Sequence, residues 1–86
     1  MNLSILTPEA EVFNGTVTSV KVPGAGGQFE ILNNHAPLVS ALVRGGVRII
    51  KEGGAKETIE ISGGFVEVLK NEVAVLAGRI IEEEEE

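Results

Sequence analysis

The chain has 86 residues, of which 43% are hydrophobic and 23% charged, which suits one small folded domain and excludes a disordered chain. It contains no Cys, no Asp and a single His, which excludes a disulfide framework, a thiolate zinc site, a multi-histidine metal site and any catalytic centre built on Asp. The net charge is −6, but five of the thirteen acids form the run 82–86, so the rest of the chain lacks the basic excess of a nucleic-acid-binding protein.

From the first residues onward, abundant Val and Ile alternate with turn-forming Gly, Pro and Asn, which predicts short strands joined by tight turns. Asn14-Gly15 is expected to separate two of these strands as a turn or a bulge. Short strands at this spacing indicate an all-β fold, an antiparallel sandwich or barrel. The nine predicted strands cover residues 2–6, 11–13, 16–22, 28–32, 38–43, 47–51, 57–62, 65–70 and 73–77.

Alternation within the strands predicts which side chains face the core. Residues 58–62 alternate most clearly, with Ile59 and Ile61 inward. In the strand 16–22, Val20 and Val22 are expected on one face and Val17 on the other. Phe65, a large aromatic residue early in its strand, is treated as a core residue.

Residues 1–81 are expected to form the folded β domain, and residues 82–86 an acidic C-terminal tail without fixed structure, because adjacent glutamates repel one another. No apolar run approaches the roughly 18 residues of a membrane-spanning helix. The first residues also lack the basic and apolar regions of a signal peptide, so a cytosolic location is the default.

Two features could carry chemistry, and neither favours catalysis. The Gly-rich loop after Pro23 begins like a dinucleotide-binding motif, but a strand follows it, so no helix N-terminus is available for a phosphate. His35 is the single imidazole and has only glutamates to orient it, so a structural or interfacial role is favoured over catalysis. The residues indicate a binding module rather than an enzyme, with no cofactor or metal.

Two other functions remain open at this point. Lys70 lies at a predicted hairpin tip, where lipoyl and biotinyl carrier domains bear their modified lysine, although the flanking Met or Asp of those domains is missing. A free-standing adaptor that binds another protein is the second alternative. Some strands are apolar at both alternating positions, as at Leu32, Val39, Ala41 and Val43. This pattern fits a central strand, scattered surface residues or a face covered by a partner.

Several motifs carry a resemblance to a known family. In order and spacing, the stretches 13–15, 20–24, 27–32, 34–38 (Asn-His-Ala-Pro-Leu), 61–68 (Ile-Ser-Gly-Gly-Phe-Val-Glu-Val) and 73–77 resemble the N-terminal domain of the epsilon subunit of bacterial F-type ATP synthase, called delta in mitochondria. The resemblance runs from about Leu3 to Ala77, and the stretches 34–38 and 61–68 are its most specific parts.

The resemblance implies a flattened antiparallel β-sandwich of about ten short strands. It implies a non-catalytic rotor subunit of the central stalk, which links the gamma subunit to the c-ring and helps couple proton-driven rotation to ATP synthesis. The implied location is peripheral, at the cytoplasmic face of the bacterial inner membrane, without insertion into it. The C-terminal helical hairpin that inhibits ATP hydrolysis in many members has no counterpart in this sequence, which reaches the glutamate run directly after Ile81.

The resemblance also implies two sets of partner-binding residues. Contact with the c-ring falls on the loop after the long second strand, here Gly26, Gly27, Gln28 and Glu30. Relatives often carry an acid where this chain has Gln28. Contact with gamma is assigned to His35, Val39, Ala41 and Val43.

Overall fold

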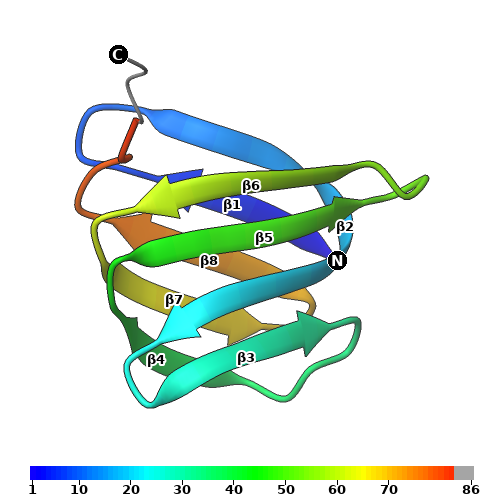
Figure 1. Cartoon of the computed structure of the whole chain (residues 1–86). Helices are drawn as coiled ribbons and strands as arrows, with labels where there is room; N and C mark the ends of the chain where they lie inside the picture. The colour runs from blue at the N-terminus through cyan, green and yellow to red at the C-terminus, as the bar shows by residue number, and fades with distance from the viewer. Residues whose placement is uncertain (83–86) are drawn as a thin grey trace.

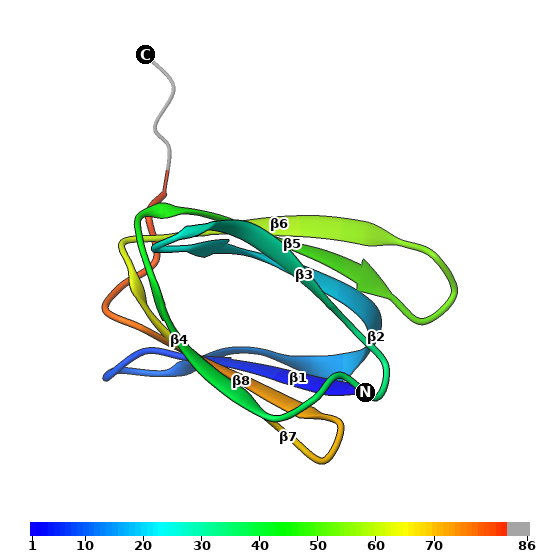
Figure 2. The same cartoon turned by 90° about the horizontal axis from the view of Figure 1, so that it is seen from below.

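The computed structural model describes residues 1–82 as two stacked layers of β-strands (Figure 1 and Figure 2). The eight strands are β1 (Asn2–Leu6), β2 (Glu11–Gly24), β3 (Gly27–Leu32), β4 (Leu38–Leu42), β5 (Gly45–Lys51), β6 (Lys56–Ile61), β7 (Gly64–Leu69) and β8 (Glu72–Ala77). Of the predicted tail, only Glu82 lies within the described residues, and 83–86 lie outside them.

The strand pairing confirms the all-β sandwich. One layer has the order β1-β8-β7-β4, and the other contains β3, β2, β5 and β6, with β3 and β5 on either side of β2. Every pair is antiparallel except β1 with β8. Figure 2 shows the two layers edge-on, with β2 passing from one to the other. Residues 1–82 contain eight strands, fewer than the nine predicted from the pattern and the roughly ten implied by the resemblance.

The lower count arises from β2, which runs through the expected turn. Asn14 pairs with Ser4 and Gly15 with Leu3, so this dipeptide is extended within a ladder instead of reversing the chain. The first part of β2 pairs with β1 in one layer, and its second part pairs with β5 and β3 in the other. A local turn signal was overridden here because a neighbouring strand offers partners to its backbone amides and carbonyls.

The register between β2 and β5 shifts between Val17 and Ser19, so Thr18 is an extra residue in a β-bulge. An extra residue reverses the alternation of side chains along a strand. As a result Val17, Val20 and Val22 are all buried, and the expectation that Val17 faces away from the other two was wrong.

The core lies between the layers and consists of inward-facing aliphatic side chains. Ile59 and Ile61 are both in it, as their alternation predicted. Phe65 is not, because it is 55% exposed while its neighbour Val66 is fully buried, so its assignment to the core was wrong. The large side chains that are no more than 2% exposed are Leu3, Ile5, Val17, Val20, Val22, Ile31, Val47, Ile49, Ile61, Val66, Val68, Val73 and Val75.

This burial predicts unequal effects of two alanine substitutions. Ile61→Ala is expected to lower the free energy of unfolding by about 2–5 kcal/mol, because it empties part of the core. Phe65→Ala is expected to lower it by about 1 kcal/mol or less, the value of a cross-strand contact on an exposed face. Urea denaturation of both variants measures the difference. Equal losses would contradict the outward orientation of Phe65.

Candidate functional site

The outer surface of the layer β1-β8-β7-β4 carries a row of apolar side chains. Cross-strand partners present their side chains on one face, and the register places Phe65 opposite both Ala41 and Leu76, with Leu6 opposite Leu76. Phe65 and Leu76 are 55% and 49% exposed. Val39 lies two residues before Ala41 on the same side of β4 and is 71% exposed. We call Leu6, Val39, Ala41, Phe65 and Leu76 the apolar face.

The strands of the apolar face carry few charges. The strands β1, β4, β7 and β8 contain no Lys or Arg and two glutamates, Glu67 and Glu72. Glu67 lies opposite Val39, both glutamates are exposed, and Lys70 at the β7–β8 hairpin lines the same hollow as these two glutamates. A contiguous exposed apolar surface with a polar rim is typical of a protein-binding site.

The turn between β2 and β3 lies at one end of the apolar face. The amide of Ala25 donates to the carbonyl of Ala41 at 2.9 Å, which ties this turn to the end of β4. Gly26, Gly27 and Gln28 are exposed, and Gly27 has a φ of 129°, a conformation that favours glycine. Three of the four residues assigned to the c-ring contact are therefore adjacent and accessible.

Glu30, the fourth of these residues, lies two positions after Gln28 on β3, so both side chains are on the same side of this strand. Its Oε2 accepts a hydrogen bond from Ser19 Oγ at 2.5 Å.

His35 lies in the loop between β3 and β4, which leads directly into the strand that carries Val39 and Ala41. Its Nδ1 is 2.7 Å from the carbonyl oxygen of Ala36. The loop is held by a hydrogen bond from the amide of Asn34 to Asn71 Oδ1 at 2.8 Å. Val43, directly after β4, is 48% exposed and donates its amide to Pro23.

The largest residues of the apolar face, Phe65, Leu76 and Leu6, were not among the partner-binding residues predicted from the sequence. One signal could have found Phe65. It shares its side of β7 with Glu67, whereas Val66 and Val68 share the other side. A glutamate two residues away marks the solvent side of a strand, so the alternation argued against burial of Phe65.

Lys70 does lie at a hairpin tip, between β7 and β8, as predicted. Both Lys70 and Asn71 have positive φ values, 52° and 65°, as expected of a tight two-residue hairpin turn. The side chain of Asn71 binds the β3–β4 loop, so this hairpin contributes to the end of the sandwich.

Comparison with known proteins decides the family. The model of the family described as ATP synthase, Delta/Epsilon chain, beta-sandwich domain matches residues 1–83. The chain belongs to this family. Because the match includes nearly every residue, all the surfaces described above lie within the delta/epsilon β-sandwich domain.

Two solved structures share the fold of this delta/epsilon domain. A chain of the Euglena gracilis mitochondrial ATP synthase, described as OSCP/F1/c-ring in rotational state 1, is 23% identical with a TM-score of 0.83. The match covers 92% of the present chain and 51% of that chain. A chain of the Tetrahymena thermophila mitochondrial ATP synthase central stalk and c-ring is 19% identical with a TM-score of 0.79, covering 94% and 65% respectively. The chain thus spans about half to two thirds of the length of these proteins.

Two further observations concern residues 1–82 of this delta/epsilon domain. No helix in this part is long and apolar enough to cross a membrane. The same residues contain no group of three or more His or Glu side chains placed to hold a metal ion.

Proposed function

We propose that this chain is a non-catalytic rotor subunit in the central stalk of an F-type ATP synthase. In this role it links the gamma subunit to the c-ring and helps couple proton-driven rotation to ATP synthesis. Family membership supports the proposal, and the apolar face is the structural observation that carries it. The proposal assigns the chemistry of ATP synthesis to other subunits.

The apolar face is the proposed contact with gamma. It joins Val39 and Ala41 to Phe65, Leu76 and Leu6 across four hydrogen-bonded strands. Torque requires that the two subunits do not slip, and a flat apolar contact on a hydrogen-bonded sheet provides a stiff attachment. The charged residues beside the apolar face, Glu67, Lys70 and Glu72, would set the orientation of gamma more than its affinity.

The β2–β3 turn is the proposed contact with the c-ring. Gly26 and Gly27 have no side chains, so the backbone of a partner can approach them closely. Apart from the adjacent residues, no heavy atom of residues 1–82 lies within 4 Å of the position of a Cβ at either residue, so this approach is open. Gln28 supplies a neutral hydrogen-bonding group. Since Ala25 is bonded to Ala41, the two proposed contacts adjoin at one end of the sandwich. Glu30, two residues after Gln28 on β3, would extend the c-ring contact, and His35, in the loop that leads into β4, would extend the gamma contact.

The proposed location follows from these partners. A subunit bound to gamma and to the exposed loops of the c-ring is peripheral to the membrane. For a bacterial enzyme this is the cytoplasmic face of the inner membrane.

A pull-down tests the proposed function. The chain is immobilised, a detergent-treated extract of the source cell is passed over it, and the retained proteins are identified by mass spectrometry. Recovery of gamma, together with alpha, beta and the c-ring, is the expected result. Recovery of an unrelated protein instead would favour the adaptor alternative. A carboxylase or dehydrogenase subunit, with added mass on Lys70, would favour a carrier domain.

A further inference from the structure

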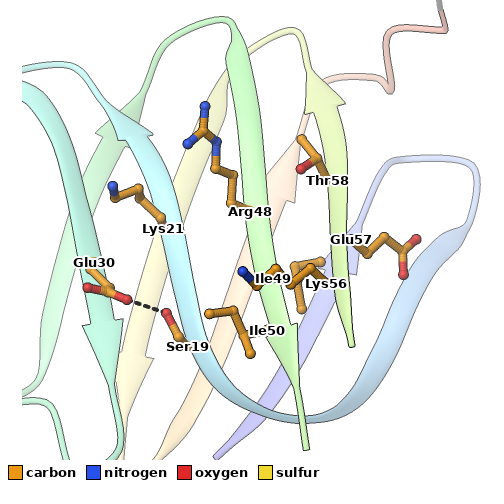
Figure 3. A pocket seen from close by; sticks show the side chains of 9 residues that line it. All are labelled: Ser19, Lys21, Glu30, Arg48, Ile49, Ile50, Lys56, Glu57 and Thr58. Atoms are coloured by element: carbon orange, nitrogen blue, oxygen red, sulfur yellow. Dashed lines mark hydrogen bonds between the residues drawn. The ribbon is translucent and has the colours of Figure 1, made fainter. Parts of the chain in front are cut away.

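The outer surface of the second layer contains a small hollow with a different chemistry from the apolar face. Its volume is about 240 Å³, and its walls come from β2, β3, β5 and β6. Pockets for drug-sized ligands have roughly 300–1,000 Å³, so this hollow suits a smaller group. The lining residues are Ser19, Lys21, Glu30, Arg48, Ile49, Ile50, Lys56, Glu57 and Thr58 (Figure 3).

Three cations from three strands line the hollow. Lys21 on β2 lies directly opposite Arg48 on β5, and Arg48 lies opposite Thr58 on β6. Figure 3 shows these three side chains in one row, with Lys56 on the neighbouring row. Like charges directly opposite one another in an antiparallel pair are destabilising. Glu30 on β3 lies opposite Lys21 on its other side and offsets part of this repulsion, and a bound anion would relieve the rest.

The carboxylates of the hollow are already engaged. Glu30 accepts the hydrogen bond from Ser19 Oγ, and Glu57 forms an ion pair with Lys51 at 2.9 Å. Within residues 1–82 this is the sole ion pair, so Lys21, Arg48 and Lys56 have no carboxylate within 4.0 Å there. The lining therefore holds three cations and two carboxylates, of which Glu57 is paired with Lys51 outside the lining and Glu30 keeps its charge.

We propose that this hollow binds a phosphate group, either as free phosphate or as the headgroup of an anionic phospholipid. The planar guanidinium of Arg48 can donate two parallel hydrogen bonds to a phosphate, and Lys21 and Lys56 add point charges on either side. The Thr58 hydroxyl supplies a further donor. A compact anion matches the three cations better than an extended acidic peptide does, because the cations are gathered around one hollow.

The site lies on the layer opposite the apolar face, so it stays open when the proposed gamma contact is made. Its existence does not rest on the proposed function. The two proposals can also fail separately, because they concern different layers and different assays.

The test is a titration of the ¹⁵N-labelled chain with inorganic phosphate at constant ionic strength, followed by two-dimensional NMR. Saturable shifts are expected at the amides of Lys21, Arg48, Lys56 and Thr58, and high salt should weaken them. Arg48→Gln is expected to weaken binding about tenfold or more, since it removes charge-assisted hydrogen bonds. The matched control is Lys70→Gln, which removes one charge at a remote hairpin and should leave the affinity unchanged.

A second arm identifies the source of the phosphate. Flotation with vesicles of phosphatidylglycerol is compared with flotation with vesicles of phosphatidylcholine, for the unmodified chain and for Arg48→Gln. If the unmodified chain binds vesicles of phosphatidylglycerol but not vesicles of phosphatidylcholine, and Arg48→Gln binds neither, the site recognises a phospholipid headgroup. The proposal is overturned if neither phosphate nor vesicles bind saturably, or if binding is equal in Arg48→Gln and the unmodified chain.

Discussion

Phe65→Glu is expected to weaken binding to gamma by at least about 100-fold while the sandwich remains folded. Phe65 is the largest side chain of the apolar face and lies between Ala41 and Leu76, at the middle of the row. A carboxylate placed there would be buried against gamma without a partner, which is strongly unfavourable. The side chain is already exposed in the isolated chain, so the substitution leaves the core intact.

The matched control for this prediction is Leu32→Glu. Leu32 is 52% exposed, close to the 55% of Phe65, but it lies on β3 in the opposite layer. Affinity for purified gamma can be measured by surface plasmon resonance, and folding by circular dichroism. We expect normal affinity for Leu32→Glu. If only Leu32→Glu lost binding, gamma would contact the layer that contains β3, and the proposal would be wrong. If both variants bound gamma as well as the unmodified chain, neither Phe65 nor Leu32 would belong to the gamma contact.

Gly64→Ala is expected to cause the largest loss of stability among the glycine-to-alanine substitutions of this chain, because its added Cβ would make the closest contact. Gly64 opens β7 with a φ of 147°, which side chains rarely adopt and which costs on the order of 1–3 kcal/mol for other residues. An added Cβ would also overlap the carbonyl oxygen of Leu76 in the paired strand β8. Relief would require β7 and β8 to separate where Gly64 pairs with Ala77.

Gly15→Ala provides the comparison for Gly64→Ala. Gly15 lies within β2, and the nearest contact of an added Cβ there is 3.5 Å from Phe13, an ordinary van der Waals distance. Alanine also restricts the unfolded chain, so this variant should be neutral or slightly stabilised. Thermal melts of the two variants measure the contrast. A melting temperature for Gly64→Ala close to that of Gly15→Ala would show that the β7–β8 pairing tolerates the added side chain.

The same glycine explains part of the motif from which the family resemblance was drawn. In the stretch 61–68, Gly63 and Gly64 both have positive φ values, 136° and 147°. They form the connection between β6 and β7, where an added Cβ at Gly63 would lie 3.3 Å from the carbonyl oxygen of Leu42. The adjacent glycines are therefore required by backbone conformation and close packing at this junction.

The sequence predicted the fold more completely than it predicted the candidate binding surface. Val39 and Ala41 were predicted from the sequence to lie on a protein-binding surface. The other residues of that surface come from β7, β8 and β1. Membership of a surface depends on strand register, which nothing in β4 specifies. The assignments of His35 to the gamma contact and of Glu30 to the c-ring contact came from the family resemblance and stay predictions.

The sequence alone determined the features that depend on local alternation and turn chemistry. It determined the all-β class, the positions of β1, β3, β4, β6, β7 and β8 to within one residue, and the burial of Ile59 and Ile61. A strand exposed on one side shows its solvent face through polar residues two apart, and this information is contained in a few neighbouring positions.

Only the tertiary structure decided features that depend on which strands pair. It made β2 one continuous strand through Asn14-Gly15, placed an extra residue at Thr18, and put Phe65 on an exposed row beside Leu76. It also gathered Lys21, Arg48 and Lys56 from three strands around one hollow. These features arise from hydrogen bonds between residues far apart in the chain, whose register is set by burial of the whole core and not by any single strand.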